Sequence, residues 1–197
     1  MSLDFSYDVD PVYKFKFVKE MTETTPSALA ETTLREKSYQ DTDANGVPDL
    51  ITETVTVNGK STVLENNVLQ SLKTTRSPEG RMAATSYDPN TLATLTMSIS
   101  GLFDTAYGYD ARGRFTSVAN NTRATSFTYN GQGFLGSVTN PKGYTTSYTY
   151  DLVGRVTGIG RPDGSSLGFA YDPNGNMTVL TNPAAVPHLF GYNKVNL

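Results

Sequence analysis

The chain has 197 residues, no cysteine, no tryptophan and a formal net charge of −3 at pH 7. The missing cysteine excludes a disulfide framework, a thiol nucleophile and a thiolate metal site, and the acidic balance argues against a nucleic-acid-binding protein. Twelve tyrosines, nine phenylalanines and 17 glycines favour half-buried strands joined by turns. No run of about 20 apolar residues is present, so no membrane span is predicted.

The first strand that periodicity predicts covers residues 12–19, where aromatic residues alternate with lysines. A period of two is typical of a strand with one face in water. Residues 22–33 are polar and predict a loop, within which Ser27 is a candidate N-cap for one helical turn that would reach Leu34. Farther along the chain, Asn58-Gly59 predicts a two-residue hairpin turn.

Residues 41–51 read Asp-Thr-Asp-Ala-Asn-Gly-Val-Pro-Asp-Leu-Ile and lie between two segments that predict strands. Oxygen-bearing side chains stand at the first, third, fifth and ninth places of this loop, and a glycine stands at the sixth. This spacing suits a hard cation such as Ca²⁺, which takes about six to eight oxygen ligands. The candidate ligands are Asp41, Asp43, Asn45, the backbone carbonyl of Val47, and Asp49.

Two interpretations of this loop stay open. An EF-hand has a glutamate at the twelfth place, where this chain has Thr52, so the loop instead resembles the Asp-rich calcium loops of integrin-type and related bacterial β repeats. The alternative is a turn without metal, because Asp and Asn side chains bond their own backbone and tolerate left-handed conformations. Four ligand-type side chains in register are more than such a turn requires.

The charge balance changes near residue 75. Residues 1–75 carry seven Lys+Arg and twelve Asp+Glu, a balance of −5, whereas residues 76–197 carry nine and seven, a balance of +2; the two sum to −3. We therefore predict an N-terminal β segment over 1–75, which contains the calcium-type loop, and a repeat array over 76–197.

A short pattern beginning Tyr-Asp or Tyr-Asn recurs through the second segment. The tyrosines stand at 109, 129, 150, 171 and 192, steps of 20, 21, 21 and 21, and Tyr87 begins a degenerate earlier copy. A fixed period of this length indicates a repeat architecture. The residues that define it are Tyr109, Asp110, Gly113, Tyr129, Gly133, Tyr150, Asp151, Gly154, Tyr171, Asp172, Gly175 and Tyr192.

Each repeat predicts one β-hairpin, so that successive hairpins form an antiparallel meander. The repeated Asp can accept backbone N–H bonds within its turn, and the repeated Gly can take a positive φ. Pairs of aromatic residues two positions apart, such as Tyr148 and Tyr150, should lie on one face and form ladders. The arginines at 112, 114, 155 and 161 are expected to cover aromatic rings or pair with turn aspartates.

The motif Tyr-Asp-x-x-Gly-Arg followed by an apolar residue and Thr, with Pro-x-Gly turns between copies, resembles the YD-repeat family of Rhs proteins. That family includes bacterial Rhs and wall-associated polymorphic toxins, shell components of insecticidal toxin complexes, and animal teneurins. The resemblance covers 76–197 well and 1–75 weakly. It implies a strip of β-sheet that spirals into a hollow shell, which encloses a toxic domain or presents an adhesion surface.

The family's Asp-Pro-x-Gly-Leu-type closing segment is absent from the sequence. The resemblance therefore implies a fragment: an all-β, antiparallel meander of hairpins forming a curved, open segment of a β-spiral shell with an exposed C-terminal edge. The expected partners are the remaining repeats and the C-terminal domain of a larger secreted or bacterial surface protein. The exposed edge also predicts self-association.

The function expected is that of a non-enzymatic structural module. The repeated aspartates are explained by turn geometry, whereas a glycosidase needs one particular carboxylate pair facing a cleft. His188 is the only histidine and offers no triad, and the run 131–136 mimics G-x-G-x-x-G without the strand and helix that a dinucleotide site needs. The alternative is a carbohydrate-binding surface module, in which repeated tyrosine faces stack on cell-surface glycans; a hydrolase is the weakest reading.

Overall fold

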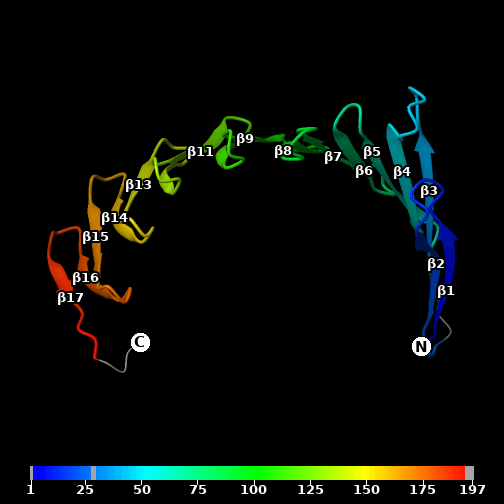
Figure 1. The fold of residues 1–197 in the computed structure, drawn as a ribbon. Coiled ribbons are helices and arrows are strands. Elements are labelled where there is room, and N and C mark those ends of the chain that lie inside the picture. Colours follow the sequence, from blue (N-terminus) through cyan, green and yellow to red (C-terminus); the bar gives the residue numbers. More distant parts are fainter. Residues whose placement is uncertain (1, 28–29, 194–197) are drawn as a thin grey trace. The chain divides into compact units, whose positions relative to one another are not determined.

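The structure, a computed structural model, describes residues 2–27 and 30–193, and every regular element within them is a β-strand (Figure 1). Seventeen strands follow one another, and the paired neighbours run antiparallel. This confirms the predicted all-β, open antiparallel meander. Among the described residues there is no helix with the length and apolar character of a membrane span.

The chain forms two compact units, residues 1–106 and 107–197. The module boundary predicted near residue 75 rests on charge and on the start of the repeats, and it remains a prediction. β9 (Thr105–Tyr109) is shared between the two units.

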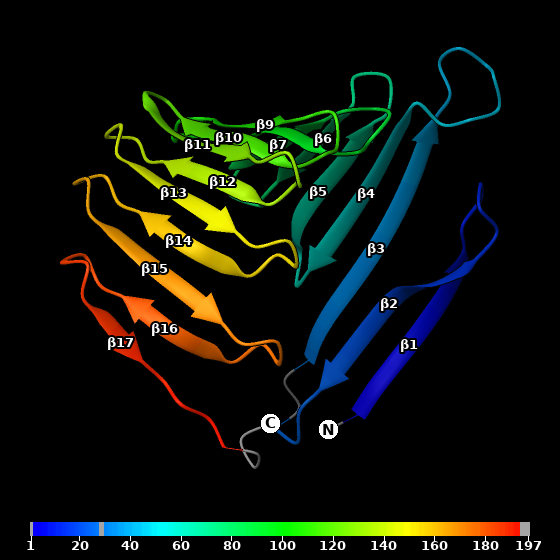
Figure 2. The same cartoon turned by 60° about the vertical axis from the view of Figure 1, so that its left-hand side comes forward.

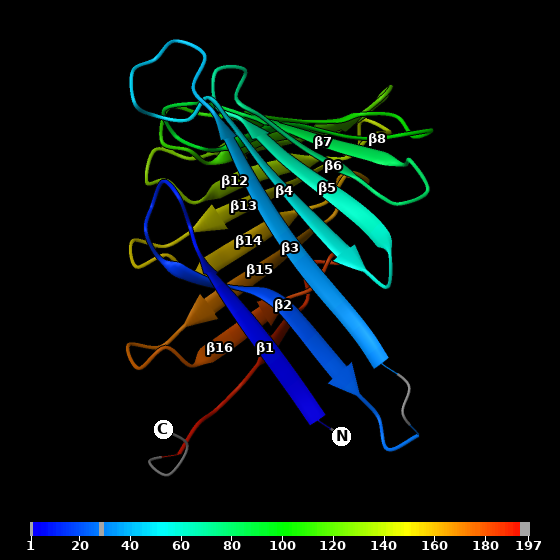
Figure 3. The same ribbon diagram turned by 90° about the vertical axis from the view of Figure 1, so that its right-hand side faces the viewer.

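The first unit is a meander of strands that lie side by side, and the first five of them have 8 to 11 residues (Figure 3). β3 (Ala30–Gln40) and β4 (Leu50–Val57) flank the calcium-type loop, as the sequence predicts. The strands are β1 (Ser2–Val9), β2 (Lys16–Thr24), β3 (Ala30–Gln40), β4 (Leu50–Val57), β5 (Lys60–Asn67), β6 (Leu72–Arg76), β7 (Met82–Tyr87) and β8 (Thr94–Ile99).

The second unit consists of shorter strands, about one hairpin to each repeat (Figure 2). Register shifts fall just before Tyr129, Tyr150 and Tyr171, where each strand leads into a repeated turn. The strands are β10 (Phe115–Asn120), β11 (Arg123–Tyr129), β12 (Leu135–Thr139), β13 (Thr145–Tyr150), β14 (Val156–Gly160), β15 (Ser166–Tyr171), β16 (Met177–Thr181) and β17 (Pro187–Leu189).

The prediction of a strand over 12–19 was wrong in its first half. β1 lies before it, and residues 11–13 form the turn between β1 and β2. Asp10 is fully buried, and its carboxylate accepts the N–H groups of Val12 and Tyr13 at 3.0 and 2.7 Å. These two hydrogen bonds to the carboxylate stabilise a turn, although the alternation of aromatic residues and lysines predicts a strand there.

Asp10 also joins this turn to β3. The Tyr39 hydroxyl donates a hydrogen bond to the Asp10 carboxylate, and the Lys37 ammonium lies 3.9 Å from it. Burial acts to raise the pKa of Asp10, but these donors outweigh burial and hold the pKa below its ordinary value. Burial and the same carboxylate raise the pKa of Tyr39.

The helical turn considered over Ser27–Leu34 is also wrong for its described part, because β3 begins at Ala30 and pairs with β2. Residues 28–29 lie outside the described residues. The hairpin turn at Asn58-Gly59 is confirmed: φ is 50° at Asn58 and 78° at Gly59, and Val57 pairs with Lys60.

No hydrophobic side chain is fully buried in the described part of the chain. A sheet with no second layer across its face cannot form the dry core of a sandwich or barrel. In β13, Thr145, Ser147 and Thr149 are exposed, and they alternate with half-buried residues that include Tyr148 and Tyr150. Each face is therefore open or only half covered, and the contacts between neighbouring hairpins must supply much of the stability.

Candidate functional site

Three carboxylates converge in the loop between β3 and β4. Asp41, Asp43 and Asp49 each offer an oxygen within 4.8 Å of the others. Asp49 is buried and accepts the N–H of Thr42 at 2.6 Å as well as the Thr42 hydroxyl. These two bonds hold the pKa of Asp49 below its ordinary value, so the carboxylate stays ionised inside the loop.

The same loop is also organised by its own hydrogen bonds. Asp41 accepts the N–H groups of Asn45 and Gly46 at 3.2 and 2.8 Å, and Asp43 accepts the side-chain amide of Asn45 at 2.9 Å. Asn45 in turn accepts the N–H of Val47 at 2.7 Å. An all-oxygen set with three carboxylates fits a hard cation such as Ca²⁺, while these internal bonds are those of Asx turns.

The repeated turns of the second unit share one geometry. Asp110 accepts the N–H groups of Arg112 and Arg114 at 2.8 and 3.0 Å, and Asp151 accepts those of Val153 and Arg155 at 3.1 and 2.9 Å. The glycine of each turn has a positive φ, in agreement with the expectation from sequence. The φ values are 76° at Gly113, 96° at Gly133, 86° at Gly154 and 92° at Gly175.

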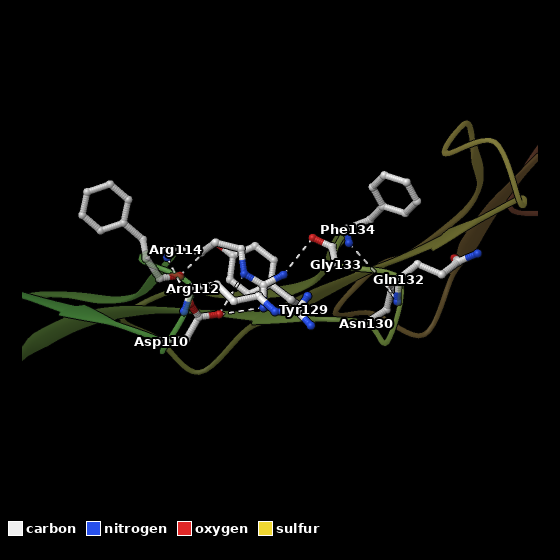
Figure 4. Close-up of polar contacts among 9 residues, drawn as sticks. Asp110, Arg112, Arg114, Tyr129, Asn130, Gln132, Gly133 and Phe134 are labelled. Atoms are coloured by element: carbon white, nitrogen blue, oxygen red, sulfur yellow. Dashed lines mark hydrogen bonds and ion pairs between the residues drawn. The ribbon is translucent and has the colours of Figure 1, made fainter. Parts of the chain in front are cut away.

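The fourth residue after the turn Asp is Arg in two repeats, and it links one repeat to the next. Arg114 forms a 2.6 Å ion pair with Asp110, and its guanidinium also donates to the carbonyl of Gly133 at 2.9 Å (Figure 4). The guanidinium carbon lies 3.9 Å from the centre of the Tyr129 ring. We call this set of contacts the interrepeat clasp.

Arg155 forms a second clasp in the same way. Its side chain lies 2.7 Å from the Asp151 carboxylate, donates to the carbonyl of Asp172 at 3.0 Å, and covers the Tyr171 ring at 4.8 Å. The sequence predicted that arginines pair with turn aspartates or cover rings. In both clasps one arginine does both, and also reaches the next turn.

The other two repeats replace the arginine. Phe134 takes its place in the repeat of Tyr129 and packs against Tyr150, with ring centres 5.0 Å apart. In the repeat of Tyr171 the residue is Asn176, which donates to Asp172 at 3.0 Å. The ring partners of the repeat tyrosines thus include Arg114, Phe134 and Arg155, so the interpretation of ladders built from the predicted aromatic pairs alone was incomplete.

In three of the repeats the tyrosine hydroxyl donates a hydrogen bond back to the repeat before it. Tyr129 donates to the carbonyl of Phe115 at 2.9 Å, Tyr171 to that of Val156 at 2.9 Å, and Tyr192 to that of Met177 at 2.8 Å. The sequence patterns did not predict these bonds, although their offsets of 14, 15 and 15 residues follow from the period. Tyr129 and Tyr171 therefore join two hairpins with both the ring and the hydroxyl.

The turn carboxylates predict a dependence of stability on pH. Hydrogen bonds from Arg114 lower the pKa of Asp110, and the bonds from Arg155 lower that of Asp151 despite its partial burial. A group with a lowered folded-state pKa stabilises the fold fully above its unfolded value, near 3.9, and loses this effect as pH falls through the folded value. We expect the melting temperature to drop below about pH 4, measured by circular dichroism; an unchanged melting temperature down to pH 3 would contradict this.

Comparisons with known proteins identify the family of this chain. A family model described as Teneurin YD-shell matches residues 16–196. The chain belongs to the teneurin YD-shell family. The matched range includes the calcium-type loop as well as every described repeat of this YD-shell segment.

The YD-shell segment also aligns with solved structures. The crystal structure of TcdB2-TccC3 without its hypervariable C-terminal region matches over 91% of the segment, with 16% identity and a TM-score of 0.53. Crystal structures of TcdB2-TccC3-TEV and TcdB2-TccC3-Cdc42 align at 12% and 11% identity with TM-scores of 0.45 and 0.46, each also over 91% of the segment and 12% of the longer chain. The segment spans 10% of the first neighbour's length, and at this identity the likeness concerns the fold. No curated protein matched.

Proposed function

We propose that this YD-shell segment is a non-enzymatic scaffold, which in a longer protein helps to enclose or present another domain. The observation that carries the proposal is the interrepeat clasp. In it, the arginine and aspartate side chains of the repeated turns are engaged in contacts that join neighbouring hairpins. The Arg114 and Arg155 guanidinium groups are each bound by a carboxylate, a carbonyl and a ring. A one-layer sheet built in this way provides a wall and requires no closed core of its own.

The partners and location follow from the same proposal. The remaining repeats of a longer shell would continue the meander, and a further domain, toxic or adhesive, would lie within or beyond them. A secreted or cell-surface protein is the setting that the family supports. The TcdB2-TccC3 neighbour has a hypervariable C-terminal region according to its name, and we propose that a variable domain of this kind accompanies the present segment.

Protease protection in the full-length protein tests the scaffold role. The domain that follows the shell should resist digestion in the native protein and become cleavable when Gly154→Ala weakens the wall. Gly175→Ala is the control, since an added Cβ there has no heavy atom within 4 Å. Digestion at the same rate in the native protein and in both variants would overturn the enclosing role.

The absence of catalysis is part of the proposal. Asp110, Asp151 and Asp172 are each engaged by the backbone of their own turn, which leaves no pair set apart for acid and base roles. His188 lies on the exposed strand β17, near the side chain of Asn182. Loss of a measured hydrolase activity on changing one of these aspartates, but not its repeat equivalents, would contradict the proposal.

Carbohydrate binding is the alternative function. It requires open tyrosine rings, whereas Tyr129, Tyr150 and Tyr171 are half-buried, and two of these rings lie against arginines. These observations support the scaffold over the sugar site. Specific binding on a glycan array, abolished by Tyr150→Ala, would favour the alternative.

We also propose that the loop of Asp41, Asp43, Asn45, Val47 and Asp49 binds Ca²⁺ in a structural role. The convergence of three carboxylates supports this, because bringing three negative charges together is unfavourable without a cation. When bound, the ion would neutralise these charges and fix the connection between β3 and β4.

Thermal melting tests the calcium proposal. With a dissociation constant of about 0.1 mM, as in extracellular modules, about 10 mM Ca²⁺ should stabilise the native state by about 2.7 kcal/mol relative to a chelator. Asp43→Asn should reduce this gain, whereas Asp163→Asn, in a turn of the second unit, should preserve it. Equal melting temperatures with Ca²⁺ and with chelator would leave the loop as an Asx turn without metal.

Self-association through the C-terminal edge remains a prediction as well. β17 is three residues long and contains Pro187, and a short strand with a proline offers few backbone donors to a second chain. We therefore expect weak association through this edge, which sedimentation velocity over a range of concentrations would measure.

A further inference from the structure

The first clasp leaves a second arginine of its turn unused. Arg112 is exposed, and within the described part of the chain its side chain forms no hydrogen bond or ion pair and covers no ring. Its backbone N–H holds the turn, through a 2.8 Å bond to the carboxylate of Asp110. The five N–H donors of the Arg112 guanidinium are therefore available to a ligand.

Arg112 and Arg114 bring two positive charges to one place. Both side chains extend from their turn toward Gly133 of the next turn (Figure 4). A Cβ on Gly133 would lie 3.5 Å from Nη1 of Arg114 and 3.7 Å from Nη1 of Arg112, so both guanidinium groups border one point beside this glycine. Asp110 neutralises Arg114 at 2.6 Å, and no carboxylate does the same for Arg112. Such an approach of like charges is unfavourable unless an anion joins them.

The neighbouring turn does not supply this anion. Asn130 stands where three other repeats have aspartate. Residues 110–114 and 130–134 together carry one aspartate and two arginines, a charge of +1, whereas residues 151–155 and 172–176 carry two aspartates and one arginine, a charge of −1. The two clasps therefore share their contacts but differ in charge, and the first has room for a negative ligand.

We propose that Arg112, with Arg114 beside it, binds a phosphate group. The planar fork of Arg112 would hold two oxygens of the phosphate. Nη1 of Arg114 uses one hydrogen on the carbonyl of Gly133 and would donate the other to a third oxygen. A carboxylate has two oxygens in one plane, so it can satisfy one fork but cannot serve both groups, and it carries half the charge of a phosphate dianion.

This site goes beyond the scaffold function and does not depend on it. Arg112 takes no part in the interrepeat clasp, so a variant that loses the ligand can keep the wall. Protection of an enclosed domain can likewise fail while the phosphate site remains, because binding is measured on residues 1–197 by themselves.

Titration of the isotope-labelled protein with inorganic phosphate tests the proposal, followed by NMR of the arginine side chains slightly above neutral pH and at constant ionic strength. We expect saturable shifts at Arg112 and Arg114 with a dissociation constant on the order of 1 mM, as for an exposed charged site. Arg112→Ala should weaken binding about tenfold. Arg112→Lys, which keeps the charge but lacks the fork, should weaken it about threefold, and Arg161→Ala should leave it unchanged.

Two further ligands define what is bound. Glycerol phosphate that binds at least as tightly as inorganic phosphate would assign the site to a phosphate monoester, and weaker binding would assign it to the free ion. Acetate that binds as tightly as phosphate would overturn the proposal, as would a lack of saturable shifts or equal binding by Arg112→Ala. Because Arg112 is exposed and outside the clasp, its variants should keep the wild-type midpoint in urea, so that lost binding reports on the site itself.

Discussion

Replacing Gly154 by alanine should lower the free energy of unfolding by about 3 kcal/mol, the sum of a backbone and a packing cost. Gly154 has a φ of 86°, which an alanine tolerates poorly. A Cβ at this position would lie only 2.6 Å from Cζ of Phe134, and the ring of Phe134 packs on Tyr150. Urea unfolding followed by circular dichroism measures the loss.

Two variants separate the two costs. Gly175 has a φ of 92° with nothing within 4 Å of an added Cβ, so Gly175→Ala should cost about 1 kcal/mol from the backbone alone. Phe134→Ala combined with Gly154→Ala should cost less than the sum of the single changes, because the ring no longer meets the new methyl group. Equal losses at Gly154 and Gly175 would contradict the packing between these repeats.

The second large effect is expected at Arg155. Arg155→Ala removes the ion pair with Asp151, the hydrogen bond to the carbonyl of Asp172 and the cover over the Tyr171 ring. The loss of a ring contact and a charged hydrogen bond should destabilise the second unit by about 2 kcal/mol. Thermal and urea unfolding provide the measurement.

Two control variants separate the contribution of the clasp from the loss of a positive charge or of an arginine in general. Arg155→Lys keeps the charge but lacks the planar fork, so it should recover only part of the stability. Arg161→Ala removes an arginine from the turn between β14 and β15, where the clasp does not form, and should cost less than about 0.5 kcal/mol. A larger loss at Arg161 than at Arg155 would contradict the clasp.

The local parts of the fold could be predicted from the sequence. The period of 20 or 21 residues identified the hairpins, and the roles of Asp151 and Gly154 in their turn follow from what Asp and Gly do in any turn. The hairpin at Asn58-Gly59 and the two strands around the calcium-type loop follow from equally short-range signals. In each case the interacting groups lie within about five residues of one another.

The missed features depend on residues far apart in the sequence. The turn between β1 and β2 forms around Asp10, whose buried carboxylate is bound by Tyr39, 29 residues away. The bond from the Tyr171 hydroxyl to Val156 spans 15 residues, and Arg155 reaches the carbonyl of Asp172 across 17. A periodic pattern gives the spacing of such groups but does not determine which of them meet, because that depends on strand register.

The place after the turn glycine adjusts how strongly successive repeats are joined. Arg114 and Arg155 make an ion pair, a carbonyl bond and a ring contact, whereas Phe134 makes a ring contact and Asn176 a hydrogen bond within its own turn. In a repeat array, stability is close to a sum of units and their interfaces. Variation at this single place can therefore change the coupling along the sheet while the turn itself stays the same.

The central claim is that the repeated motif joins neighbouring hairpins. A double-mutant cycle between Arg155 and Tyr171 tests it most directly, with Arg155→Ala, Tyr171→Ala and the double variant compared by urea unfolding. We predict that the double variant loses less stability than the sum of the single variants, by about 1 kcal/mol. Additive losses would show that the two residues act independently and would contradict the account.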